Sequence, residues 1–128
     1  MVIASDWKAA RLVEQRLLKE VARHGYSEAA VFAIKLALEE GLTNAIRHGN
    51  GGDPTKKVEV SFDVDANRAV ITITDQGEGF NPAAVPDPTA DENLEKPSGR
   101  GIMLMRAYMD EVRYNTRGNQ VHILKRNT

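Results

Sequence analysis

The chain has 128 residues, of which 41% are hydrophobic and 27% are charged, which is the size and composition of one ordinary globular domain. A formal net charge of −1 argues against the basic surface that nonspecific nucleic-acid binding needs, and the absence of cysteine excludes disulfides and thiolate metal sites. Neither a signal-peptide pattern nor an apolar run of about 20 residues is found, so we expect a cytoplasmic, soluble domain with no membrane or direct nucleic-acid partner.

Two amphipathic helices are predicted at the start of the chain. Ser5 is in position to cap the first, which ends at about Arg23 before Gly25, and Ser27 caps the second, which runs to about His48. The apolar stripe of the first helix comprises Leu12, Leu17, Leu18 and Val21. The apolar face of the second comprises Ala30, Ile34, Ala37, Leu38, Gly41, Leu42 and Ala45.

A β-hairpin is predicted after a glycine-rich loop over residues 49–54. Residues 57–64 alternate apolar and polar side chains, and residues 69–74 are rich in β-branched side chains with the same alternation. Residues 65–67, Asp-Ala-Asn, are typical of a turn. The two strands are therefore expected to pair antiparallel.

The chain changes character over residues 75–98, which hold four of the five prolines. A loop of this length inside a compact domain usually has a functional role. A helix is then predicted from about Gly99 to a point before Asp110. Residues 112–116 and 120–125 are predicted to form a closing hairpin.

Three polar side chains lie four residues apart on the second helix: Glu40, Asn44 and His48. At about 100° per residue they form a slowly drifting stripe at the edge of the apolar face. Asparagine is a poor helix former, because its side chain competes for backbone hydrogen bonds, so some interaction is expected to compensate for Asn44. Taken alone, the stripe also fits a solvated helix face.

The turn Asp75-Gln76-Gly77-Glu78-Gly79-Phe80 directly follows an apolar strand. Its glycines permit positive φ and a close approach of the backbone to a ligand. The Asp75 carboxylate is able to accept a hydrogen bond from an amino group such as adenine N6. Taken alone, the turn also fits an ordinary acidic exit from a strand.

The segment Ser98-Gly99-Arg100-Gly101 opens an apolar helix. Glycines at a helix start leave backbone N–H groups free to face an anion, and the helix dipole favours negative charge there. Arg100 adds a positive charge beside such an anion. A short Gly-x-Gly is weak on its own, and the glycine-rich lysine loop of P-loop enzymes is absent.

Together, and in this order, the three motifs resemble the GHKL superfamily of ATP-binding domains. Residues 40–49 look like its N box, residues 75–80 like its first glycine box, and residues 99–102 like its second. Within the superfamily the chain is most similar to the bacterial anti-sigma-factor serine kinases, because the similarity extends over residues 38–48 and 101–112.

The resemblance implies an α/β fold over residues 1–128, a two-layer sandwich of helices on a mixed β-sheet, with ATP and Mg²⁺ as cofactors. Asp75 would bind the adenine amino group and Asn44 would help to hold Mg²⁺. Residues 81–98 would form an ATP lid. The implied cofactor-binding residues are Asn44, His48, Asp75, Gly77, Gly79, Gly99, Arg100 and Gly101.

Glu40 is the candidate general base for a serine hydroxyl, since it lies one helical turn from Asn44, whereas Glu39 points about 100° away. The resemblance implies an anti-anti-sigma (STAS-type) protein as the substrate and a sigma factor as the second partner. It also allows a homodimer.

Two positions depart from the family pattern. Pro97 stands where many members carry an arginine, for which Lys96 or Arg100 is a possible substitute, and residues 118–120, Gly-Asn-Gln, stand where Gly-Thr is usual. These departures leave two alternatives to a kinase. One is a nonenzymatic, ATP-responsive binding protein, and the other is a detached ATPase-like module of a two-component system.

Overall fold

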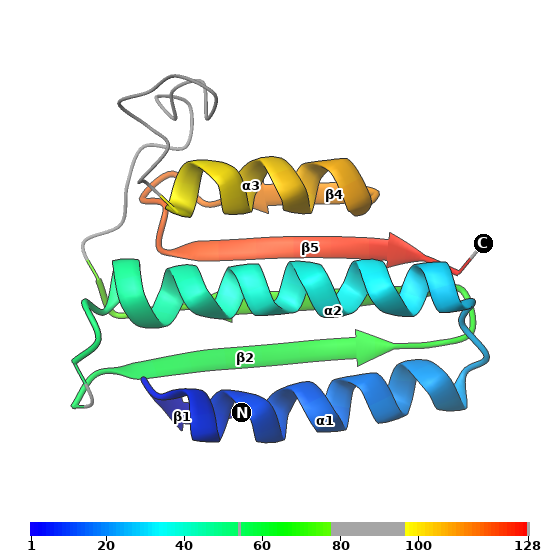
Figure 1. Ribbon diagram of the computed structural model, residues 1–128, viewed down its shortest axis with the longest axis horizontal. Helices are drawn as coiled ribbons and strands as arrows, with labels where there is room; N and C mark the ends of the chain where they lie inside the picture. The colour runs from blue at the N-terminus through cyan, green and yellow to red at the C-terminus, as the bar shows by residue number, and fades with distance from the viewer. Residues whose placement is uncertain (54, 78–96, 128) are drawn as a thin grey trace.

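The computed structural model describes residues 1–53, 55–77 and 97–127, with residues 97–102 described by their backbone alone. Three helices lie in front of a five-stranded sheet (Figure 1). The elements in chain order are β1 (Val2–Ala4), α1 (Trp7–Arg23), α2 (Glu28–Thr43), the π-helical segment η1 (Asn44–Gly49), β2 (Lys57–Val64), β3 (Arg68–Thr74), α3 (Pro97–Tyr108), β4 (Glu111–Tyr114) and β5 (Gln120–Arg126).

The strand order is β1-β2-β3-β5-β4, and each neighbouring pair is antiparallel. The expected two-layer α/β sandwich is confirmed, but the expectation of a mixed sheet is wrong for the strands described. The physical reason lies in the connection through α3. That connection brings β4 back parallel to β3, but β5 lies between them and runs against both.

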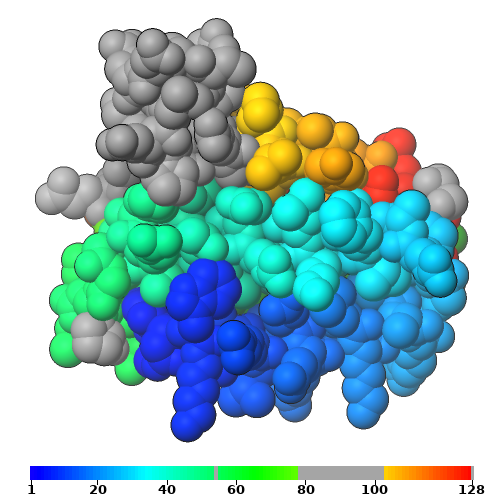
Figure 2. Space-filling model, viewed as in Figure 1, coloured from blue at the N-terminus to red at the C-terminus, as the bar shows by residue number. Residues whose placement is uncertain are grey.

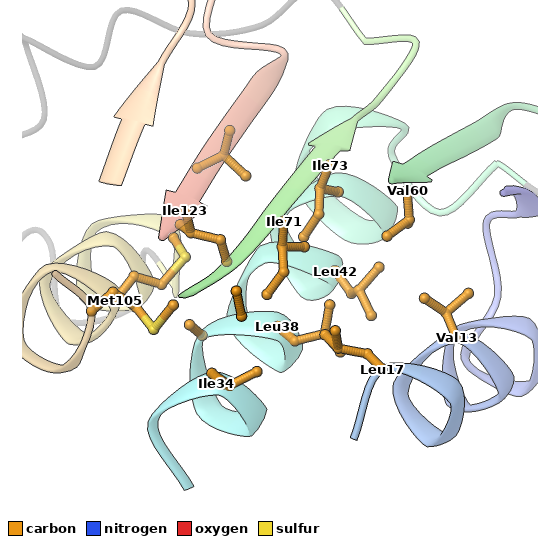
Figure 3. Packing of buried hydrophobic residues seen from close by; sticks show 14 of the residues in the cluster. Val13, Leu17, Ile34, Leu38, Leu42, Val60, Ile71, Ile73, Met105 and Ile123 are labelled. Atoms are coloured by element: carbon orange, nitrogen blue, oxygen red, sulfur yellow. The ribbon is translucent and has the colours of Figure 1, made fainter. Parts of the chain in front are cut away.

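The helices cover one face of the sheet side by side, with α2 between α1 and α3 (Figure 2). Alternate residues of β3 and β5 are buried, as the period of two along a strand requires when only one face is covered. The core joins side chains from all three helices and from β2, β3 and β5 (Figure 3). Those labelled there are Val13, Leu17, Ile34, Leu38, Leu42, Val60, Ile71, Ile73, Met105 and Ile123.

The first helix begins one residue later than expected. Asp6, not Ser5, caps it by accepting a hydrogen bond of 2.8 Å from the backbone N–H of Ala9. Ser5 is buried and donates instead to the backbone oxygen of Lys56 at 2.7 Å. Both residue types cap helices well, so a tertiary contact decides between the two neighbours.

The stripe expected on the first helix is partly wrong, because Leu12 is 60% exposed. The buried positions are Ala10, Val13, Leu17 and Val21. The Ser27 cap of α2 is confirmed, since its hydroxyl accepts from the N–H of Ala30, and the expected apolar face of α2 is buried throughout. None of the described helices is long and apolar enough to cross a membrane.

Several elements end or begin at one end of the molecule. The C-terminal end of α2, the start of β2, the start of β5 and the start of α3 all lie at the left of Figure 1. The end of β3 lies there too, because Thr74 pairs with Glu59 near the start of β2, and the three motifs are found at the end of α2, after β3 and at the start of α3. The fold therefore brings together segments that are far apart in the sequence.

Candidate nucleotide-binding site

A cavity of about 130 Å³ lies at this end of the molecule. A cavity of roughly this size is large enough for an aromatic ring. Its walls come from α2 and η1 on one side and from β3, β4, β5 and the turn between β4 and β5 on the other. The lining residues are Gly41, Asn44, Ala45, His48, Gly49, Ile73, Asp75, Tyr114, Gly118, Asn119, Gln120 and Val121.

The helix that carries the polar stripe changes its hydrogen-bond pattern at Asn44. The backbone N–H of Asn44 still donates to Glu40, so these residues lie one α-helical turn apart as expected. From Asn44 to Gly49 the helix is wound as a π-helix, a form that is rare and often marks a functional site. Asn44 and His48 both line the cavity, whereas Glu40 lies one turn earlier and is not part of the lining.

The amide of Asn44 is buried without a well-formed hydrogen bond in the described part of the chain, at both its oxygen and its nitrogen. Leaving such a group unsatisfied costs about 1–3 kcal/mol. The Tyr114 hydroxyl is also buried and interacts with Asn44. Burial raises the pKa of Tyr114 to about 12, although Asn44 and Arg106 oppose that rise. Asn44 lines the cavity, and an amide oxygen is a ligand that suits a hard cation such as Mg²⁺.

No group of three or more His, Cys, Asp or Glu side chains able to hold a metal ion occurs among the described residues.

Asp75 lies directly after β3 and is half-buried against the glycines of two motifs. Its Oδ1 accepts a hydrogen bond of 2.8 Å from the N–H of Gly77. A Cβ at Gly49 would overlap the Asp75 carboxyl, and a Cβ at Gly77 would overlap the backbone oxygen of Gly49. Glycine at both positions is therefore what lets the carboxyl sit where it does.

The electrostatic surroundings of Asp75 pull in two directions. Burial raises its pKa, while the Gly77 N–H, Arg117 and Lys56 act to lower it. Burial, followed by repulsion from Arg47, lowers the pKa of His48, which favours the neutral imidazole. Burial, followed by the neighbouring Glu39, raises the pKa of Glu40, which favours proton acceptance over a permanent charge.

The turn between β4 and β5 contributes groups that the sequence did not indicate. Asn119 holds the backbone of Asp75 by two hydrogen bonds: its backbone oxygen accepts from the Asp75 N–H at 2.9 Å, and its side-chain Nδ2 donates to the Asp75 backbone oxygen at 3.3 Å. Arg117 donates to the backbone oxygen of Gly77 at 3.3 Å. Gln120 donates to the Thr74 hydroxyl at 2.9 Å. The Gly-Asn-Gln segment, noted above as a departure, thus supports the Asp75 turn directly.

The second glycine box lies in the first turns of α3, as expected. Because Pro97 is the first residue of the helix, Gly99, Arg100 and Gly101 are its third to fifth residues, and of these three only Gly99 has a backbone N–H among the donors that a helix leaves without an intrahelical partner. Gly79 and residues 81–96 of the expected lid lie outside the described residues. The last two lid residues, 97 and 98, begin α3.

The chain is similar to several curated bacterial proteins. It is 36% identical over 101 residues to a serine-protein kinase RsbW of Bacillus licheniformis, with 72% of this chain and 61% of that protein covered. It is 31% identical over 100 residues to the RsbW of Bacillus subtilis, with 72% and 61% covered. It is 36% identical over 90 residues to an anti-sigma F factor of Anoxybacillus flavithermus, with 68% and 61% covered. The chain thus spans about three fifths of the length of these relatives.

The fold resembles a solved structure, that of the RsbU and RsbW domains of a Mycobacterium tuberculosis protein. The TM-score is 0.57 at 19% identity, covering 99% of this chain and 31% of that one. The sequence also matches the histidine kinase-like ATPase domain over residues 3–125. The chain therefore belongs to the histidine kinase-like ATPase domain family, which implies that it binds ATP.

Proposed function

We propose that the chain is an MgATP-dependent serine protein kinase and anti-sigma factor, which phosphorylates an anti-anti-sigma (STAS-type) protein and sequesters a sigma factor. One observation carries the proposal: Asn44, whose buried amide makes no well-formed hydrogen bond, and Asp75 line the same cavity although their motifs are about 30 residues apart. The printed names of the relatives, serine-protein kinase RsbW and anti-sigma F factor, support the choice of reaction and partner.

Nucleotide binding would divide between the two walls of the cavity. Asp75 would accept a hydrogen bond from the adenine amino group, and the absence of a side chain at Gly77 leaves room beside the carboxyl. Gly79 remains a predicted binding residue from the same motif. Asn44 offers its amide oxygen to Mg²⁺, which when bound neutralises phosphate charge. The start of α3 would bind the phosphates: the Gly99 N–H would donate to them, Gly101 would allow their close approach, and Arg100 would add a positive charge. Neutral His48 is able to donate a hydrogen bond in the same region.

Phosphoryl transfer would use Glu40 as the base. As the serine oxygen forms its bond to the γ-phosphorus of ATP, the bond to the ADP oxygen breaks and the hydroxyl proton passes to the Glu40 carboxylate. Partial burial of Glu40 supports this role, because a raised pKa brings the carboxylate closer to the operating pH. Most of the rate enhancement in such a reaction comes from positioning and charge neutralisation.

A nonenzymatic, ATP-responsive binding protein is the second candidate, and one observation favours it. Pro97, where many family members have an arginine, is the first residue of α3 and adds no cation beside the phosphates. Incubation of the chain with γ-labelled ATP and a STAS-type partner separates the candidates. Phosphoserine on the partner that disappears with Glu40→Gln supports the kinase. Tight binding of ATP and partner without any label supports the alternative, and phosphohistidine on a partner supports a two-component module.

The nucleotide site itself is tested by thermal unfolding with ATP, with and without Mg²⁺. A ligand at a hundredfold excess over its Kd stabilises the folded state by about 2.7 kcal/mol. We expect Asp75→Asn to lose this stabilisation and Asn44→Ala to lose the part that depends on Mg²⁺. Asp63→Asn, on an exposed position of β2 at the other end of the sheet, is the matched control. Absence of stabilisation of the wild type by millimolar MgATP would refute the site.

A further inference from the structure

A closed ring of hydrogen bonds among Asn50, Gln76 and Lys57 supports the turn that begins at Asp75. The backbone N–H of Gln76 donates to Asn50 Oδ1 at 2.8 Å. The Gln76 side-chain oxygen accepts from the backbone N–H of Lys57 at 2.7 Å. The backbone oxygen of Lys57 accepts from Asn50 Nδ2 at 2.9 Å, which closes the ring. Three residues from η1's end, the start of β2 and the end of β3 are thus tied to one another.

Asn50 is the buried member of this ring, since only 2% of it is exposed. Its second Nδ2 proton goes to the Ser5 hydroxyl at 2.8 Å, and Ser5 in turn donates to the backbone oxygen of Lys56. Both amide protons and the amide oxygen of Asn50 therefore have partners. Because a backbone N–H only donates and a backbone C=O only accepts, these partners fix the orientation of the Asn50 amide.

We propose that Asn50 is a positioning residue for nucleotide recognition, which holds the turn from Asp75 to Gly77 in the geometry that reads adenine. This inference rests on the proposed function. Asn50 touches no part of the cavity; it acts on Asp75 through the next residue, Gln76. A buried side chain with all its hydrogen bonds made, such as Asn50, rigidifies its surroundings, and discrimination by a hydrogen-bonding site depends on such rigidity.

Two substitutions test the ring, one at its buried member and one at an exposed member. Asn50→Ala removes three hydrogen bonds and leaves the Gln76 N–H unsatisfied, and we expect the Kd for MgATP to rise about tenfold or more. Gln76→Ala removes only the bond to Lys57 from an exposed side chain, so the fold is retained, and we expect a rise of about threefold. Asn67→Ala, in the exposed turn at the opposite end of the sheet, is the matched control with no expected effect.

The decisive readout is the ratio of ATP to GTP affinity, measured by titration well below the unfolding temperature. A merely structural role for Asn50 would lower the Tm and leave this ratio unchanged. A positioning role predicts that the ratio falls in both ring variants. Unchanged affinity and unchanged selectivity in folded Asn50→Ala, or in Gln76→Ala if the first variant does not fold, would overturn the proposal.

Amide hydrogen exchange of the nucleotide-free protein separates this inference from the proposed function. The N–H of Gln76 should be protected in the wild type and lose that protection in Asn50→Ala. If Asn50→Ala loses the protection but the wild type binds no ATP, the ring still supports the turn and the proposed nucleotide binding is refuted. Retained protection in Asn50→Ala would refute the positioning role by itself.

Discussion

At the scale of single residues, the contact between Gly49 and the Asp75 carboxyl leaves no room for a side chain at position 49. Gly49→Ala places a methyl group on the Asp75 carboxyl, so either the turn or the end of η1 has to move. Overpacking of this kind costs typically about 1–3 kcal/mol, and we expect a lower Tm and weaker stabilisation by ATP. Gly51→Asn is the control, because Gly51 has open space and a φ of 62°, which Asn tolerates. Wild-type ATP binding by Gly49→Ala would contradict the tight packing.

Tyr114 is the second residue-scale test, because its hydroxyl is the buried group that interacts with Asn44. Tyr114→Phe removes that hydroxyl and leaves the ring in place, so the Asn44 amide loses an orienting partner. We expect the Mg²⁺ concentration needed for half-maximal ATP stabilisation to rise, with metal-free ATP binding unchanged. Tyr108→Phe, on an exposed position of α3, should leave the Mg²⁺ titration as it is. An unchanged titration in Tyr114→Phe would show that Asn44 is oriented without it.

At the scale of elements, Glu14 of α1 and Glu39 of α2 interact, and we expect the two carboxyl groups to share a proton. Burial, together with a hydrogen bond to and repulsion from Glu39, raises the pKa of Glu14 to about 7, against the attraction of Lys35 and Arg11. The folded-state pKa lies above the unfolded value of 4.5. The protonated Glu14 carboxyl therefore contributes its full stabilisation of the folded state below pH 4.5, and this contribution is lost as the pH rises through the folded-state pKa of about 7.

Glu14→Gln should remove the pH dependence of stability that comes from Glu14, because an amide keeps the hydrogen bond to Glu39 and cannot ionise. We expect the variant to gain Tm relative to the wild type at pH 8 and to lose that advantage at pH 5. Glu59→Gln, on an exposed position of β2, should shift the Tm by a similar small amount at both values. A pH-independent difference between Glu14→Gln and the wild type would contradict the shared proton.

The longer elements were predictable from the sequence because their periods repeat several times. The apolar face of α2 and the hairpin of β2 and β3 are confirmed for that reason. Strand β1 has three residues, too few to show a period, and only its pairing with β2 makes it a strand. Segment η1 was expected to continue as an α-helix, and nothing local in its sequence encodes the π-helical winding.

The residues of the site likewise fall into those that the sequence predicts and those that it does not. Asn44, His48 and Asp75 stand in recognisable motifs, and the structure brings them to one cavity. Asn50 contacts a residue 26 positions away along the chain, and Tyr114 contacts one about 70 positions away. No local sequence pattern could therefore have predicted that they belong to the site.

At the scale of the whole molecule, stability rests on one layer of contacts between the helices and the sheet. Leu38 lies in that layer and is fully buried, whereas Leu12, expected to be buried on α1, is 60% exposed. Truncation of a buried leucine costs about 2–5 kcal/mol, and a surface substitution stays within about 0.5 kcal/mol. For a domain whose free energy of unfolding is about 5–15 kcal/mol, the loss expected from Leu38→Ala is a large fraction of the total stability.

Urea denaturation of Leu38→Ala and Leu12→Ala measures this difference directly. We expect the midpoint to fall strongly in Leu38→Ala and to stay near the wild-type value in Leu12→Ala, with the slope unchanged in both. Because a ligand that binds only the folded state adds the same free energy to any variant with an intact site, MgATP should raise both midpoints. Equal losses in the two variants would mean that α1 presents Leu12 to the core and that the helix is rotated from its place on the sheet. A midpoint of Leu38→Ala that MgATP cannot raise would mean that the core and the cavity are one structural unit, because Leu38 lies only one turn before Gly41 in the cavity wall.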